Sequence, residues 1–142
     1  MISHPVSHID FVPTLLDLLG QPNHPQCAGQ SLLPLINNVT ALPKNVFLEW
    51  APNRTKVKKG STLARRRAIK RAIDESTRAL VSPEGWKLCL RDKDLNELYN
   101  LNEDPFETRN LYPDSQYAAV ISHFETEIYR WQDATNDKLK LQ

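Results

Sequence analysis

The chain has 142 residues, which is enough for one domain with a modest core. Its composition, 40% hydrophobic and 25% charged, is ordinary for a globular protein, and a net charge of +1 favours no particular partner. No apolar run approaches the roughly 18–20 residues that a membrane span needs, and Met1–Pro5 has no recognisable export signal. We therefore expect no membrane span, and either an intracellular protein or a longer natural N-terminus.

A short apolar helix is predicted over residues 11–19. Its apolar stripe follows the helical spacing i, i+3, i+4, i+7, at Val12, Leu15, Leu16 and Leu19. Ser7 and Asp10 have the form of a capping box, and Gly20 fits the position after the helix end. Because almost every residue of this helix is apolar, we expect it to be covered on more than one side.

Residues 21–41 are rich in proline and indicate an extended connector, with a single apolar turn at Ser31–Ile36. Val46–Trp50 follows as a strand. It is apolar on both faces, which predicts a central position in the sheet. The three tryptophans, Trp50, Trp86 and Trp131, are expected in the core.

The segment 54–71 is strongly basic, with nine positive charges in eighteen residues and no acid. Two interpretations stay open: a solvated insertion, or an anion-binding loop. Nucleic-acid binding would need aromatic or motif support, which is missing, so we expect no nucleic-acid partner. The basic residues are Arg54, Lys56, Lys58, Lys59, Arg65, Arg66, Arg67, Lys70 and Arg71.

The second half predicts an antiparallel sheet and a closing helix. Residues 77–81 and 86–90 flank a Pro-x-Gly turn and indicate a hairpin, and Glu97–Leu101 adds a further strand. A helix over 115–133, capped by Asp114 or Ser115, carries an apolar stripe that would lie across the sheet. The fold class is therefore α+β, with an antiparallel sheet of about four strands packed by a C-terminal amphipathic helix.

The stretch Glu97–Leu111, ELYNLNEDPFETRNL, resembles the C-terminal signature of formylglycine-dependent sulfatases of the alkaline-phosphatase superfamily. The likeness is to the C-terminal region of N-sulphoglucosamine sulphohydrolase and the arylsulfatases. As in that family, the stretch follows a Trp-Lys-Leu strand, here at 86–88, and precedes an amphipathic helix. The agreeing positions are Leu98, Tyr99, Asn100, Leu101, Asp104, Pro105, Glu107, Asn110 and Leu111.

Residues 6–20, VSHIDFVPTLLDLLG, and residues 29–36, GQSLLPLI, are similar to a second sulfatase run. In the family this run packs against the large α/β catalytic domain. The resemblance implies that residues 1–41 are the helix and connector from the end of such a domain, and that residues 42–142 form the sulfatase C-terminal α+β subdomain. It covers nearly the whole chain, but only about the last quarter to third of a typical family member.

The resemblance implies a sulfuric ester hydrolase that uses formylglycine and a divalent cation, usually Ca²⁺, in a catalytic domain that this chain lacks. Neither Cys27 nor Cys89 lies in Cys-x-Pro-x-Arg, the sequence in which sulfatases form formylglycine. We therefore expect no catalytic residue and no metal site in this chain, and no activity from it alone. Family members are usually periplasmic, secreted or lysosomal.

Two functions are open at this point. The chain is either a sulfatase C-terminal fragment that completes the wall of the substrate pocket, or a free-standing, non-enzymatic binding module with a basic polyanion-binding loop. The expected partners are the catalytic domain, a sulfated carbohydrate, or a second copy bound through an exposed first helix. The candidate substrate-binding residues are Arg65, Arg66, Arg67, Arg78 and Lys87.

Three further features carry weaker signals. A disulfide between Cys27 and Cys89 is an alternative to the favoured interpretation of two unpaired thiols. The four histidines lack an accompanying acidic ligand set, and His123 is expected at the surface of the last helix. Asn38 and Asn53 begin N-glycosylation sequons.

Overall fold

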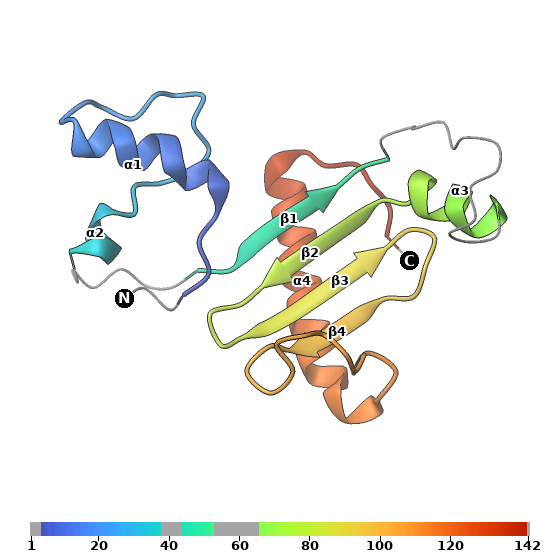
Figure 1. Cartoon of the computed structure of the whole chain (residues 1–142). Helices are drawn as coiled ribbons and strands as arrows, with labels where there is room; N and C mark the ends of the chain where they lie inside the picture. The colour runs from blue at the N-terminus through green and yellow to red at the C-terminus, as the bar shows by residue number, and fades with distance from the viewer. Residues whose placement is uncertain (1–3, 38–43, 53–65, 142) are drawn as a thin grey trace. The chain divides into compact units, whose positions relative to one another are not determined.

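The computed structural model describes residues 4–37, 44–52 and 66–141 (Figure 1). The chain divides into two compact units, one made of Met1–Val46 with Ser82–Glu84 and the other of Phe47–Val81 with Gly85–Gln142. Each unit is described by itself below. The predicted domain boundary after residue 41 stays a prediction.

The first unit contains a 3₁₀ turn, His8–Asp10, followed by α1, Phe11–Leu18, and a short α2, Leu33–Ile36. The predicted helix is confirmed, and Gly20 ends it with a left-handed φ of +66°. The predicted capping box is wrong, because the Ser7 side chain makes no cap bond. Asp10 instead holds the connector, since its Oδ1 accepts from the Gln30 amide at 2.9 Å.

The connector also closes onto α1 through Thr14 and Gly29. Thr14 Oγ1 donates to the Asp10 carbonyl at 2.6 Å and accepts from the Leu32 amide at 2.9 Å. Gly29 passes so close to the backbone of Ile9 that a Cβ there would overlap the Ile9 carbonyl. These contacts cover only one side of α1, and Phe11 and Leu18 stay 63% and 64% exposed.

The second unit is built on a four-stranded sheet of order β1-β2-β3-β4. Its strands are β1, Val46–Trp50; β2, Thr77–Val81; β3, Trp86–Arg91; and β4, Glu97–Asn100. β2 pairs antiparallel with β3, and β3 with β4. The α+β class and the hairpin are confirmed, and the hairpin turn uses Gly85 at φ +87°.

The prediction that β1 is central is wrong, because β1 lies at the edge of the sheet next to β2. Its apolar residues on both faces do not reflect burial on both faces. Phe47 stacks on Trp131 with ring centroids 5.2 Å apart, whereas Leu48 and Trp50 point to the opposite face and are 47% and 56% exposed. Trp50 is therefore not the core residue expected from its type.

Two helices complete this unit. α3, Arg66–Asp74, precedes β2, and α4, Ala118–Thr135, follows a 3₁₀ turn at Ser115–Tyr117. The Asp114 side chain caps the turn by accepting from the Gln116 amide, as predicted. α4 contacts β2 and β3 and crosses one face of the sheet (Figure 1).

The core lies between this face and α4. Strand residues two apart share a face, so Leu80, Leu88, Leu90 and Leu98 point together toward α4, and each is fully buried. Phe124 and Ile128 of α4 and Leu111 complete the cluster. Burial of each such side chain contributes about 1.5–3 kcal/mol, which makes this cluster the main source of stability.

Candidate functional site

The signature stretch Glu97–Leu111 folds as a strand, a tight corner and a return. Asn110 fixes the return, because its Oδ1 accepts from the Leu98 amide at 3.0 Å and its Nδ2 donates to the Asn96 carbonyl at 2.9 Å. Asp104 fixes the corner by accepting from the Arg109 amide at 2.9 Å and from Thr108 Oγ1 at 3.1 Å. The Arg109 bond also holds the pKa of Asp104 below its usual range. These signature polar residues thus satisfy backbone groups of the corner and the return.

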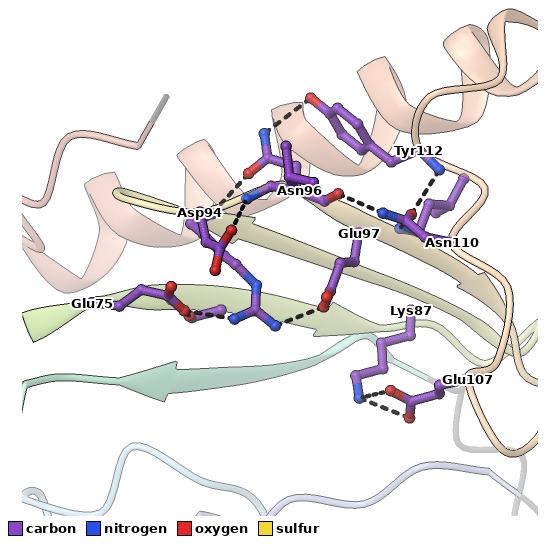
Figure 2. A network of polar contacts seen from close by, with 12 residues as sticks. Glu75, Lys87, Asp94, Asn96, Glu97, Glu107, Asn110 and Tyr112 are labelled. Carbon is purple, nitrogen blue, oxygen red and sulfur yellow. Dashed lines mark hydrogen bonds and ion pairs between the residues drawn. The ribbon is translucent and has the colours of Figure 1, made fainter. Parts of the chain in front are cut away.

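Glu107 is a signature residue that forms an ion pair with β3. It adopts a left-handed backbone with φ +56°, which is costly for a residue with a side chain. Lys87 Nζ donates to both carboxylate oxygens of Glu107, to Oε1 at 2.8 Å and to Oε2 at 2.7 Å (Figure 2). The ion pair joins the corner to β3 on the far face, the face of the sheet opposite α4.

Arg91 forms a second charged group on the far face. Its Nη1 donates to Glu75 Oε1 at 2.6 Å and its Nη2 to Glu97 Oε2 at 2.7 Å, so one guanidinium bridges two carboxylates. Burial acts to lower the pKa of Arg91, but the bonds to Glu97 and Glu75 raise it overall. Arg91 Nε is buried and has no hydrogen-bond partner among the described residues.

Arg78 lies on the other face, beneath the C-terminal end of α4. It is 4% exposed, and its Nε donates to Asp137 Oδ2 at 2.7 Å while its Nη2 donates to Glu49 Oε1 at 3.2 Å. Its Nη1 donates to the carbonyls of Trp50 and Thr77. The guanidinium therefore ties β1, β2 and the segment after α4 together.

The described part of the basic segment forms a charged hollow beside α3. The hollow is open to solvent and has a volume of about 630 Å³. Lys93, from the turn between β3 and β4, donates to the Asp74 carbonyl at the end of the helix. Arg71 Nη2 pairs with Asp94 Oδ2 at 2.7 Å. We call this feature the basic hollow; its lining residues are Arg67, Ala68, Lys70, Arg71, Asp74 and Lys93.

Two cations of the basic hollow form no ion pair with any residue that the structure describes. Arg67 and Lys70 are exposed, and neither forms an ion pair within residues 4–37, 44–52 and 66–141. Lys93 and Asp94 lie in the turn between β3 and β4. Their role depends on contacts across about twenty positions of the chain, and no local pattern could have revealed it.

The five residues predicted to bind substrate do not come together in one place. Arg65 lies outside the described residues, Arg66 is the first residue of α3, and Arg67 lines the basic hollow. Arg78 and Lys87 point to opposite faces of the sheet. Arg78 pairs with Leu90 and shares its face, and side chains alternate along β3, so Lys87, three positions before Leu90, points to the other face. Substrate binding by these residues stays a prediction.

The remaining candidates add no chemistry to this site. Cys27 and Cys89 are both free thiols, as the favoured interpretation expected, and His123 is exposed. Asn38 and Asn53 lie outside the described residues. Within the described ranges no cluster of three or more His, Cys, Asp or Glu side chains could hold a metal ion. The helices of that same part of the chain include none that is long and apolar enough to cross a membrane.

Comparison with known proteins shows which family has this combination of sheet, signature corner and closing helix. Residues 1–134 match the family described as N-sulphoglucosamine sulphohydrolase, C-terminal, and the chain belongs to this sulfatase C-terminal family. Arylsulfatase K of Danio rerio is 33% identical over 119 residues, which cover 80% of this chain and 20% of the relative.

Solved structures share the fold. A 2-O GAG sulfatase superposes with a TM-score of 0.69 at 22% identity, covering 94% of this chain and 26% of that protein. The phosphonate monoester hydrolase of Agrobacterium radiobacter superposes with a TM-score of 0.61 at 23% identity, and the match covers 88% of this chain and 24% of that protein. The chain thus spans only about a fifth to a quarter of the length of the proteins it matches.

Proposed function

We propose that this chain is the C-terminal subdomain of a sulfatase and forms one wall of the pocket in which a catalytic domain hydrolyses a sulfate ester or sulfamate. The observation that carries the proposal is the family match over residues 1–134 combined with coverage of only 20% of Arylsulfatase K. A region of that extent corresponds to one part of a larger enzyme. The chain alone is then inactive.

Two apolar surfaces support a missing partner. α1 leaves Phe11 and Leu18 exposed, and β1 leaves Leu48 and Trp50 exposed on the far face of its sheet. Soluble proteins seldom leave such side chains open to water unless another surface covers them. In this proposal, the catalytic domain provides that cover.

The catalytic groups that the family uses belong, in this proposal, to the catalytic domain. Formylglycine and a divalent cation, usually Ca²⁺, would supply the hydrolytic chemistry there, as the resemblance to sulfatases implies. The described residues of this chain offer no donor cluster that fits the cation. The contribution of the chain is therefore binding and positioning of a sulfated carbohydrate, the substrate type named for the family and for the 2-O GAG sulfatase.

The test is to sequence the transcript upstream of the Met1 codon and to measure the mass of the natural polypeptide. We expect an in-frame extension that contains Cys-x-Pro-x-Arg, and aryl sulfate hydrolysis by the extended protein but not by the 142-residue chain. A natural polypeptide of 16.3 kDa without an extension would overturn the proposal.

A second candidate function is a free-standing binding module. The exposed cations Arg67 and Lys70, which lack ion pairs in the described part of the chain, favour it. Such a module must cover Phe11 and Leu18 by itself, and association of two copies through α1 would do so. Sedimentation of the purified chain separates the two: a stable dimer that is disrupted by Phe11→Ser supports the module, and a monomer supports the subdomain.

A further inference from the structure

We propose that the basic hollow is a binding site for a sulfated polysaccharide, with Arg67, Lys70 and Lys93 as the residues that contact sulfate groups. The choice of sulfate as the anion rests on the proposed function. The choice of the site rests on the geometry of α3 and the β3–β4 turn. Nothing in the family match assigns ligand binding to this helix.

The helix separates its charges from its apolar residues. Arg67, Lys70 and Arg71 are spaced i, i+3 and i+4, which places them on one side of the helix with neighbouring Cβ atoms about 5–6 Å apart. Ile69 and Ile73 lie on the opposite side and are half-buried. The charged side is therefore directed away from the apolar contacts of the helix, toward solvent and the hollow.

Two contacts fix α3 against the turn, and neither uses Arg67 or Lys70. Arg71 is paired with Asp94, and Lys93 donates to the Asp74 carbonyl. Lys93 Nζ also forms an ion pair with Asp92 Oδ2 at 3.8 Å, which is beyond hydrogen-bond distance. An ammonium carries three donors, so two of them form no hydrogen bond with the described residues. Arg67 and Lys70 form no ion pair within the described ranges, so an arriving anion needs to displace no protein carboxylate from them.

The lining of the hollow favours a sulfated polysaccharide over two other polyanionic partners. Its lining side chains include no aromatic ring on which a nucleic-acid base could stack. A membrane surface would require the apolar face of α3 to be free, but Ile69 and Ile73 are half-buried. Each exposed ion pair contributes only about 0.2–1 kcal/mol, so a ligand needs several linked sulfate groups to bind measurably.

The test measures binding of heparin to the full chain. Desulfated heparin, which keeps its carboxylates but lacks the sulfate groups, is the control ligand. We expect the chain to bind heparin and the variant Arg67→Glu/Lys70→Glu to bind about tenfold more weakly or worse, since two contacts are lost and two repulsions are added. The dependence of log Kd on log salt should be shallower in the variant by about 1.5–2, as counterion release predicts for two lost contacts.

The matched control is Lys138→Glu/Lys140→Glu, which changes the net charge equally at two exposed lysines after α4. We expect it to weaken heparin binding by less than about threefold, the size of a general charge effect. Lys93→Gln should lower affinity as well, because it removes a cation from the other side of the hollow. Circular dichroism checks that each variant keeps the fold.

Three results would overturn the proposal. They are equal losses in the two charge-reversed variants, binding of desulfated heparin as tight as that of heparin, or tighter binding of single-stranded DNA or of phosphatidylserine vesicles. Each of these can occur while an upstream catalytic region is present. Conversely, a polypeptide without that region could still bind heparin here, so this test and the test of the proposed function fail separately.

Discussion

Arg78 Nε lies 2.7 Å from Asp137 Oδ2, and this ion pair fixes the segment after α4 to the second strand of the sheet. Gln132 Nε2 donates to the same carboxylate oxygen at 2.8 Å, and the Leu139 amide donates to Oδ1 at 3.1 Å. A buried guanidinium is thus neutralised by a carboxylate that arrives from 59 residues away. The C-terminal segment is therefore part of the structure that stabilises the sheet.

Removal of the Asp137 charge should destabilise the chain. We expect Asp137→Asn to cost about 2–3 kcal/mol in the free energy of unfolding, somewhat less than a fully broken buried pair because Arg78 keeps Glu49. Urea unfolding of both proteins measures the difference. Asp133→Asn, at an exposed position near the end of α4, should change stability by less than about 0.5 kcal/mol. Equal effects of the two substitutions would contradict this account.

The same carboxylate predicts an acid-dependent loss of stability. The hydrogen bond from Arg78 lowers the pKa of Asp137 from 3.8 to about 2. A folded pKa below the unfolded one stabilises the protein above the unfolded pKa, and this contribution is lost as pH falls through the folded value. Between about pH 4 and about pH 2 the natural chain should lose about 2 kcal/mol more than Asp137→Asn. Parallel pH profiles of the two proteins would refute the assignment.

Two glycines of the first unit should differ in their tolerance of alanine. Gly29→Ala places a methyl group on the Ile9 carbonyl, so the connector must leave α1. Gly20→Ala meets no atom within 4 Å and costs only its left-handed backbone, about 1–2 kcal/mol. Amide hydrogen exchange at Gln30 and Leu32 should therefore accelerate strongly in Gly29→Ala and little in Gly20→Ala. The reverse order would show that the connector is not packed on α1 in solution.

The two thiols should react at very different rates. Burial raises the pKa of Cys89 to about 11, which leaves roughly one thiolate in a thousand at about pH 8. Cys27 is half-buried in the connector. Mass spectrometry after brief iodoacetamide treatment should find one label, on Cys27, and a second only in guanidinium chloride. Labelling of Cys89 in the native protein would mean that the far face opens readily.

Local signals explain which parts of the fold could be predicted from sequence. The hairpin follows from Pro83 and Gly85, whose φ of +87° suits glycine, and α4 follows from its apolar stripe and the Asp114 cap. The strand order does not follow from such signals. β1 is apolar on both faces, but only one face is packed: Phe47 stacks on Trp131, whereas Leu48 and Trp50 are exposed. The difference between the two faces becomes visible only in the assembled sheet.

The candidate site was less accessible to sequence reasoning for the same reason. The basic composition of 54–71 includes the cations of α3, whereas Arg78 and Lys87 were grouped with them from charge and expected placement in the sheet. Their partners, Asp137 and Glu107, lie 59 and 20 residues away and convert both cations into structural contacts. Lys93 was not among the candidates, and the β3–β4 turn brings it to the basic hollow.

β1 and β2 are neighbours in the sheet, yet the connection between them holds the whole basic segment and α3. The entropy of closing such a connection rises only slowly, by about 0.6 kcal/mol for each doubling of its length. The segment can therefore lengthen, shorten or exchange its charges during evolution while the leucine core stays unchanged. Selection for a new ligand and selection for a stable sheet can in this way act on separate stretches of one small chain.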